Sequence, residues 1–202
     1  MVRAGNGFSV GVTQTGSVLY WGNFIPGDDD PLLATNVMSI DCFVGPGSSS
    51  FGALFDDGRI RTWRSEGATS NSPKEEIFQA LAVGGSFTVG LTENHQAIAW
   101  TGSSGIGPDF ESALDITGQT LKQIDAGTFH SVGLRFDGSV VCFGSNLFGE
   151  CSQPGGIFTE VAAGSVCTLG LRRDGSVVVW GGESDPGGGA IFGPGQPPTD
   201  IG

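Results

Sequence analysis

The residues best suited to acid–base chemistry are the two histidines, His95 and His130. An imidazole changes its charge near neutral pH, and a neighbouring hydroxyl such as that of Ser131 could serve as a nucleophile. Adjacent residues of a β-strand point to opposite faces, however, so His130 and Ser131 are not expected to form a catalytic pair. In the related segments described below, the position of His130 is taken by Phe8, Ser50, Phe87 and Cys167. We therefore interpret His130 as a packed side chain with one hydrogen bond.

The cysteines are the next candidates for chemistry, and their spacing fits no metal-binding motif. The four positions are Cys42, Cys142, Cys151 and Cys167. Four cysteines allow three sets of disulfide pairs, and nothing in the sequence forces any of them. Because free cysteine is among the most buried residue types, buried free thiols are the favoured interpretation.

The remaining polar clusters have simple explanations. The three aspartates at 28–30 are adjacent, so their carboxylates project in different directions, and a solvated turn is expected rather than a cation site. The glycine-rich stretch 102–107 lacks the lysine of a phosphate-binding loop. Asp57, Asp137 and Asp174 each precede a glycine and are typical of turns. The sequence therefore predicts no catalytic cluster, no metal site and no cofactor.

The elements that would position any functional group are five copies of one β-rich unit. Each unit starts at a glycine, here called the anchor glycine, and ends at an aromatic residue sixteen positions later. The anchors are Gly5, Gly47, Gly84, Gly127 and Gly164, and the aromatics are Trp21, Trp63, Trp100, Phe143 and Trp180. Three positions before the anchors stand Val2, Val44, Leu81, Ile124 and Val161. We expect the aromatics to pack in the core between units.

A short turn divides each unit into two apolar runs. The turns are Thr15-Gly16, Asp57-Gly58, Asn94-His95, Asp137-Gly138 and Asp174-Gly175. Asp-Gly between β-rich runs predicts a hairpin with a type I′ turn, in which both central residues have positive φ. Asn and His also tolerate positive φ better than most residues.

The period of the units predicts the fold. The anchors lie 42, 37, 43 and 37 residues apart, and strand-only repeats of about 40 residues are typical of propeller blades. We expect an all-β fold in which residues 1–202 form a single β-propeller domain of five blades. This could be a small ring or part of a seven-bladed one. The Gly- and Pro-rich segment 183–202 is expected to be a tail or the connection that closes the ring.

The charge limits the choice of partner. The formal net charge is −12, from 21 acidic and 9 basic residues, which favours a basic protein surface over nucleic acid as the partner. No run approaches 18 apolar residues, so no membrane insertion is expected. Arg59, Arg61 and Arg64 surround Trp63 in the second unit. The charge of Arg61 is expected to be paired or to lie at a ring edge; alternatively, this blade is exposed and the arginines contact a partner.

The fourth unit resembles a known family. It reads Ile124-Asp-Ala-Gly-Thr-Phe-His130-Ser131-Val-Gly-Leu134 and continues through Gly138 to Phe143-Gly144, which resembles the repeat of the regulator of chromosome condensation superfamily. The connection LFGECSQPGGIFTEVAAG resembles that of its short-repeat members, such as the bacterial β-lactamase-inhibitor propeller and crinkly-type plant receptor kinase ectodomains. The resemblance implies a propeller, mostly of seven blades and without a catalytic cluster. The paired cysteines of the crinkly-type blades are missing here.

The resemblance also implies a binding face. In the chromatin protein, residues just after the anchor glycine line the face that meets its GTPase. The matching positions here are Asn6, Ser48, Ser86, Thr128, Phe129, His130 and Ser165. The other histidines and aspartates prominent there are absent, so nucleotide exchange is not expected. We predict a non-enzymatic protein-binding scaffold that uses these loops. The alternatives are an extracellular ligand-binding fragment of a crinkly-type receptor kinase and, third, a propeller hydrolase or lyase.

Overall fold

The structure, a computed structural model, describes residues 2–4, 8–22, 35–45, 48–64, 69–85, 87–101 and 113–182. These residues form five antiparallel sheets in chain order, and each sheet corresponds to one of the sequence units. The first three sheets contain β1 (Val2–Ala4), β2 (Phe8–Val12) and β3 (Val18–Gly22); β4 (Val37–Gly45), β5 (Ser48–Phe55), β6 (Ile60–Arg64) and β7 (Thr69–Asn71); and β8 (Phe78–Val83), β9 (Thr88–Thr92) and β10 (Ala97–Trp100). The last two contain β11 (Gln123–Ala126), β12 (His130–Leu134) and β13 (Val140–Gly144), and β14 (Phe158–Ala163), β15 (Cys167–Arg172) and β16 (Val177–Gly181). A single 3₁₀ turn, η2 (Leu114–Ile116), precedes the fourth sheet in this part of the chain.

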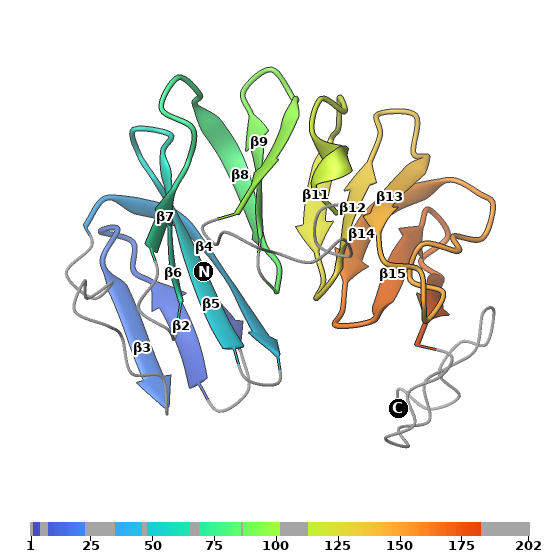
Figure 1. Cartoon of the computed structure of the whole chain (residues 1–202), viewed down its shortest axis with the longest axis horizontal. Coiled ribbons are helices and arrows are strands. Elements are labelled where there is room, and N and C mark those ends of the chain that lie inside the picture. Colours follow the sequence, from blue (N-terminus) through green and yellow to red (C-terminus); the bar gives the residue numbers. More distant parts are fainter. Residues whose placement is uncertain are drawn as a thin grey trace.

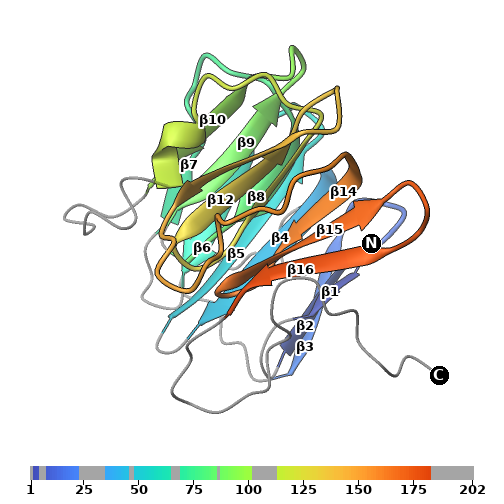
Figure 2. The same ribbon diagram turned by 90° about the vertical axis from the view of Figure 1, so that its right-hand side faces the viewer.

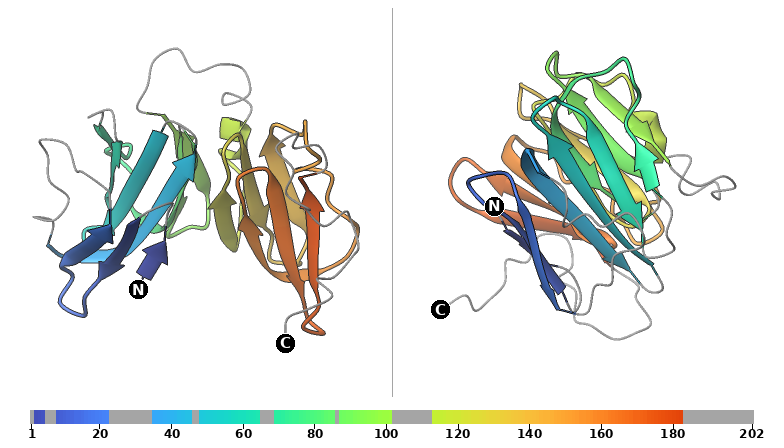
Figure 3. Two further views of the ribbon diagram at one scale, coloured as in Figure 1. Left: turned by 90° about the horizontal axis from the view of Figure 1, so that it is seen from below. Right: turned by 90° about the vertical axis from the view of Figure 1, so that its left-hand side faces the viewer.

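The sheets are arranged as propeller blades. Figures 1 and 3 show them side by side in a curved row, with the first and fifth sheets at its two ends, and Figure 2 views the row from the fifth sheet. The first strand of every sheet, namely β1, β4, β8, β11 and β14, contributes residues to one cavity of about 520 Å³. Among the described strands, the extensive contacts between sheets join each sheet to the next along the chain. The predicted five-repeat β-propeller fold is thus confirmed, and the described blades form an open row.

In the last three blades, whose anchor glycines are described, these glycines provide space at the start of the second strand. A Cβ on Gly84 would lie 2.6 Å from the ring of Phe87, and one on Gly164 would lie 2.7 Å from the sulfur of Cys167. A Cβ on Gly127 would meet the ring of His130 and lie 2.5 Å from the Gly164 carbonyl oxygen. The residue three positions after the anchor therefore fills the space that a larger anchor residue would need.

The turns at the far ends of the blades differ in conformation from the predicted type. Gly58, Gly138 and Gly175 have φ of +75°, +84° and +85°, whereas the aspartates before them do not have positive φ. The predicted type I′ turn is therefore wrong: the loops are longer, with a single left-handed residue after a turn, as in a three-residue hairpin loop. His95 takes the same conformation with φ of +63°, as expected for the Asn-His turn.

These left-handed residues direct their carbonyl groups to the following blade. The carbonyl oxygens of Gly16, Gly58, His95 and Gly138 accept hydrogen bonds from the backbone N–H groups of Val37, Phe78, Leu121 and Phe158, at 3.0, 2.8, 2.8 and 2.9 Å. One such bond is present at each of the four junctions. The turns therefore set the spacing between blades as well as closing hairpins.

From the second unit onwards, the aromatic at the end of the unit packs towards the preceding blade. Trp180 is fully buried in a cluster with Val132, Leu134 and Val140 of the fourth blade, and Trp63 is buried in a cluster with the first blade. Core packing is confirmed for these two, and Trp100 and Phe143 are half-buried. The prediction is wrong for Trp21, whose exposed fraction is 51%. The reason is its place in the first blade, where its face has no preceding blade in the described part of the chain.

The second blade departs from the repeat register. The pairing of Ile40 with Ala53 matches that of Ile124 with Gly133, and Ile40 is fully buried. The residue equivalent to Ile124 is therefore Ile40, and the prediction of Val44 for that position is wrong. Four extra residues lengthen the β4–β5 hairpin, which projects beyond the shorter connections of the other blades.

The two ends of the blades are named by their loops. We call the end with the anchor glycines the anchor end, and the opposite end, with the Asp-Gly turns, the turn end.

Candidate binding face at the mouth of the central cavity

The central cavity is lined largely by polar groups on the first strands. Arg3, Asp41, Gln123, Asp125 and Glu160 contribute side chains to its lining. Register shows that Arg3, Asp41 and Asp125 occupy the same position in their blades, where the third and fifth blades carry Ala82 and Ala162. The cavity therefore combines three carboxylates with one guanidinium.

The two equivalent aspartates link neighbouring blades. Asp41 accepts a hydrogen bond from the N–H of Val83 at 2.8 Å, and Asp125 accepts one from the N–H of Ala163 at 2.7 Å. Arg3 forms an ion pair with Asp41, with a distance of 3.3 Å from Nε to Oδ1. Each carboxylate thus satisfies an amide on the first strand of the following blade, in the manner of an additional sheet bond.

Burial makes these two carboxyl groups weaker acids than an exposed aspartate, because it raises their pKa values. It raises the pKa of Asp125 to about 6, and the neighbouring charge of Asp41 adds to the rise, while the amide of Ala163 opposes it. Burial also raises the pKa of Asp41, against the hydrogen bond from Val83 and the charge of Arg3. Since burial disfavours a charged carboxylate, a cation entering the cavity would restore favourable electrostatics.

The loops after the anchor glycines of the third, fourth and fifth blades are joined to one another beside this cavity. Gly164 and Ser165 line the cavity, and the N–H of Thr128 donates to the Ser165 carbonyl at 3.1 Å. The Thr128 and Ser165 hydroxyl oxygens lie 2.8 Å apart, and the N–H of Gly85 donates to the Gly127 carbonyl at 3.2 Å. The structure thus brings Thr128 and Ser165 together and links the loops of three blades into one surface. Phe129, the next residue after Thr128, is half-buried.

His130 does not belong to this surface. Its side chain is fully buried, and its Nε2 lies 3.1 Å from the hydroxyl oxygen of Thr168, which itself donates to the Glu150 carbonyl at 2.9 Å. The interpretation as a packed histidine with one hydrogen bond is confirmed, and its assignment to a partner-facing position is corrected. Burial lowers the pKa of His130, against the nearby charge of Glu150. The neutral imidazole holds the fourth and fifth blades together.

Of the remaining residues predicted for the binding face, only Ser48 lies in the part of the chain that the structure describes. Asn6 and Ser86 lie outside the described residues, as do the anchors Gly5 and Gly47 and the segment 183–202. Ser48 begins β5 at the tip of the long hairpin of the second blade, at the anchor end.

The cysteines differ from the prediction in one pair. Cys142 and Cys151 form a disulfide, so the interpretation of these two as free thiols is wrong. The connection after β13 folds back and brings Cys151 beside that strand, with a Cα–Cα distance of 5.3 Å. Cys42 and Cys167 are free and half-buried, as expected. Burial, together with the charge of Asp41, raises the pKa of Cys42 to about 11, so this thiol is not an activated nucleophile.

Sequence reasoning missed the aspartates of the cavity. Asp125 could have been found, because it stands within the clearest repeat and lies between two apolar residues of a first strand. Asp41 was hidden by the insertion in its hairpin, which shifted the alignment of the second unit. Among the described residues, including those of the cavity, no group of three or more potential metal ligands is present. The described part of the chain also contains no helix of sufficient length and apolar character to cross a membrane.

Comparison with known proteins places the fold in a defined class. Residues 121–150 match the family model of the Regulator of chromosome condensation (RCC1) repeat. The chain is therefore a β-propeller with an RCC1-type repeat in its fourth blade. No curated protein sequence matches the chain significantly.

Solved structures share this fold. The CRINKLY WD40 ectodomain of the Arabidopsis thaliana receptor kinase ACR4 is 22% identical with a TM-score of 0.67, over 98% of this chain and 66% of that one. The ectodomain of the Physcomitrella patens receptor kinase CR4 is 22% identical with a TM-score of 0.65, over 87% and 49%. Prp20p of Saccharomyces cerevisiae, studied for its binding to Gsp1p and histones, is 17% identical with a TM-score of 0.62, over 89% and 56%. The chain thus spans about half to two thirds of the length of these structures.

Proposed function

We propose that the protein is a non-enzymatic scaffold that binds another protein at the anchor end of its blades. The observation that carries this proposal is the joining of the loops of three blades, through Gly85, Thr128 and Ser165, into one surface at the mouth of the central cavity. A rigid surface of this kind loses little conformational entropy on binding. Prp20p, which has the same fold, binds proteins.

The charge of the cavity supports a basic partner. Asp41, Asp125 and Glu160 line it against one arginine, in a chain whose net charge is −12. A lysine or arginine side chain from a partner would meet desolvated carboxylates there, where charge-assisted hydrogen bonds are strong. The buried His130 and the high-pKa Cys42 support a binding role over a catalytic one.

The test is affinity capture followed by binding measurements on the isolated partner. We expect a partner whose affinity falls as salt rises, because its basic groups face this acidic mouth. Placing a cation at the mouth with Ser165→Arg should weaken binding about tenfold or more, equivalent to about 1.4 kcal/mol. Gln153→Arg, on an exposed connection away from the mouth, is the matched control. Equal binding by both variants would refute the proposed face.

A second candidate is a ligand-binding ectodomain of a surface receptor. The Cys142–Cys151 disulfide favours it, since disulfides persist mainly in oxidising compartments. Mass spectrometry of the protein isolated from its source cells distinguishes the candidates: full oxidation of this pair favours the ectodomain, and a reduced pair removes the argument for it.

A further inference from the structure

The last described strand, β16, forms the outer edge of the fifth blade. The strand order β14, β15, β16 places it farthest from the central cavity, which the first strands line (Figure 2). Its sequence is Val177-Val178-Val179-Trp180-Gly181. One side of the strand pairs with β15. The other side, here called the free edge of β16, pairs with no strand among the described residues.

The register shows which backbone groups lie on the free edge. The N–H of Arg172 donates to the Ser176 carbonyl at 2.9 Å, so the carbonyl of Ser176 points to β15. Backbone groups of an antiparallel strand point alternately to its two sides. Every second residue after Ser176 therefore bonds β15, and the N–H and C=O groups of Val177 and Val179 lie on the free edge. These groups form no hydrogen bond with a described residue.

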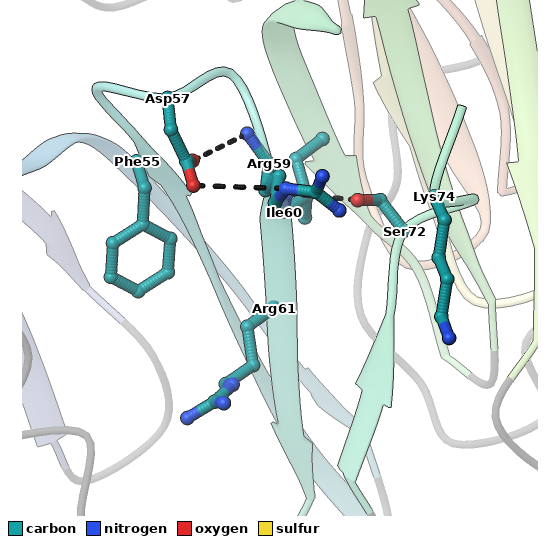
Figure 4. A pocket seen from close by; sticks show the side chains of 7 residues that line it. All are labelled: Phe55, Asp57, Arg59, Ile60, Arg61, Ser72 and Lys74. Atoms are coloured by element: carbon teal, nitrogen blue, oxygen red, sulfur yellow. Dashed lines mark hydrogen bonds and ion pairs between the residues drawn. The ribbon is translucent and has the colours of Figure 1, made fainter. Parts of the chain in front are cut away.

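The equivalent edge is occupied by backbone in the second and third blades. In the second blade β7 pairs with β6, and the N–H of Ser72 donates to the Ile60 carbonyl at 2.8 Å, next to the bond from the Ile60 N–H to the Ser72 hydroxyl (Figure 4). In the third blade the N–H of Ala97 donates to the Gln119 carbonyl at 2.9 Å. Ile60 and Ala97 stand at the repeat position of Val177. The molecule thus shows twice that this edge binds a further segment of chain.

The free edge of β16 lacks the features that usually block pairing. Natural edge strands carry charged side chains, prolines or bulges. β16 contains no charged residue and no proline, and its pairing with β15 runs without a register shift. In the fourth blade, by contrast, Cys142 stands at the position of Val179, and its disulfide brings Cys151 beside the strand. The fifth blade therefore offers a regular and unprotected strand.

The side chains beside the free edge are aliphatic. Val177 and Val179 share one face of the sheet with their cross-strand partners Leu171 and Leu169. The opposite face carries Trp180 and packs on the fourth blade. Val177 is 40% exposed, and the other three aliphatic residues are half-buried. An added strand would place every second side chain on the aliphatic face, so those side chains should be apolar.

The net charge decides between two kinds of occupant. A second copy that paired its own β16 here would bring together two chains of charge −12, which electrostatic repulsion opposes. A separate extended segment that is uncharged or basic meets no such repulsion.

We propose that the free edge of β16 binds an extended segment of a partner protein as the fourth strand of the fifth blade. The segment bonds the backbone of Val177 and Val179, carries apolar side chains at alternate positions, and is uncharged or basic at the others. This site goes beyond the proposed protein-binding face, since it lies on the outer rim of the blade and uses none of the residues of that face.

The probe is the peptide acetyl-Arg-Val-Thr-Val-Thr-Val-Arg-amide, titrated into the full chain and followed by NMR of the backbone amides. We expect saturable binding in which the amides of Val177 and Val179 shift and become protected from exchange with solvent. The amides of Val178 and Trp180, already bonded to β15, should keep their protection. Absence of saturable binding, or shifts confined to other blades, would overturn the proposal.

Two N-methylated peptides test main-chain pairing directly. Residues opposite each other in antiparallel strands share a face, so the valines of the peptide lie opposite Val177 and Val179 and exchange hydrogen bonds with them. Methylation of the valine nitrogens should weaken binding about tenfold or more, because these donors are lost. Methylation of the threonine nitrogens, which point to solvent, should change binding by less than about twofold. Equal loss for the two peptides would refute the pairing.

Variants of the strand locate the site. Val179→Pro removes one N–H of the free edge and leaves the bonds to β15, since proline is tolerated at the edge of a sheet; it should weaken binding about tenfold or more. Val179→Thr keeps the N–H and the branched shape, so it is the matched control and should bind like the unaltered chain. Circular dichroism checks that both variants fold, and the methylated peptides decide if the proline variant does not.

The free protein supplies the last test. Amides of Val177 and Val179 that are already protected without peptide would overturn the proposal. Protection that rises with protein concentration would identify a second copy as the occupant, and protection independent of concentration would identify a segment of this chain.

Discussion

The burial of Trp180 and the exposure of Trp21 predict very different effects from the same substitution. Trp180 is fully buried and its ring lies 5.7 Å from that of Phe158, measured between centres, so Trp180→Ala leaves a cavity between the fourth and fifth blades. Such changes cost about 3–5 kcal/mol. Its Nε1–H is buried without an acceptor among the described residues, and removing that unsatisfied group offsets part of the cost. We therefore expect a loss of about 3 kcal/mol in the free energy of unfolding.

Trp21 stands at the same repeat position, yet 51% of it is exposed. Val2 and Leu19, on the same face of the first blade, are 60% and 55% exposed. Truncation there leaves no enclosed cavity and removes roughly half of the buried area, so Trp21→Ala should cost about 1 kcal/mol. Trp180→Phe is a matched control, because Phe143 holds this position in the fourth blade; it should cost less than about 1 kcal/mol.

The assay is urea denaturation followed by circular dichroism, since the substitutions remove fluorescent tryptophans. Midpoints and slopes are compared, because blades of a repeat protein need not unfold together. Similar losses for Trp21→Ala and Trp180→Ala would refute the reasoning, and would show that the face of the first blade is covered in solution. A loss below about 1 kcal/mol for Trp180→Ala would refute the assigned packing between the last two blades.

Three further predictions concern other junctions. The pKa of Asp125 is raised from 3.8 to about 6, so the folded state binds the extra proton between these values and its stability falls as pH rises through that window. Asp125→Asn should make this fall shallower, leaving the part that comes from the raised pKa of Asp41, and should add roughly 2 kcal/mol at pH 7. The measurement is denaturation from about pH 4 to 8, with Asp174→Asn as control. Gly127→Ala should cost about 2–3 kcal/mol because its Cβ would meet His130 and the Gly164 carbonyl, whereas Gly155→Ala, with open space around it, should be nearly neutral in the same assay. Loss of the Cys142–Cys151 disulfide by double substitution to Ala should lower stability by roughly 2–3 kcal/mol, as expected for a loop of this length, and an unchanged melting temperature would contradict that.

The sequence was sufficient to predict the blades because the repeat combines several local signals. An anchor glycine, a turn residue that accepts positive φ and a final aromatic recur together, and the structure gives each a separate role: space for the next side chain, a carbonyl bond to the following blade, and packing on the preceding one. Five agreeing copies make a chance match improbable. The repeat pattern misassigned Val44. The hairpin of the second blade contains an insertion, and Val44 happens to be an aliphatic residue three positions before the anchor glycine, although the equivalent strand position is Ile40.

What could not be predicted depends on neighbours in space. The pattern that buries Trp180 also contains Trp21, and only the arrangement of the blades shows that one is covered and the other is not. The disulfide required knowledge of how the connection after β13 folds back. The side chains at the cavity mouth likewise became a surface only when the loops of three blades were seen to be joined.

The position shared by Arg3, Asp41 and Asp125 explains why the first strands can serve both stability and binding. Where this position holds an aspartate, the carboxylate replaces a sheet bond to the next blade, but its burial opposes ionisation. The ion pair with Arg3 relieves this for Asp41, whereas Asp125 has no ion pair with a described residue. A partner cation in the cavity would lower the pKa of Asp125 towards its ordinary value and release a proton near pH 6. The junction that is least satisfied in the free protein is thus the one that gains most from a basic partner.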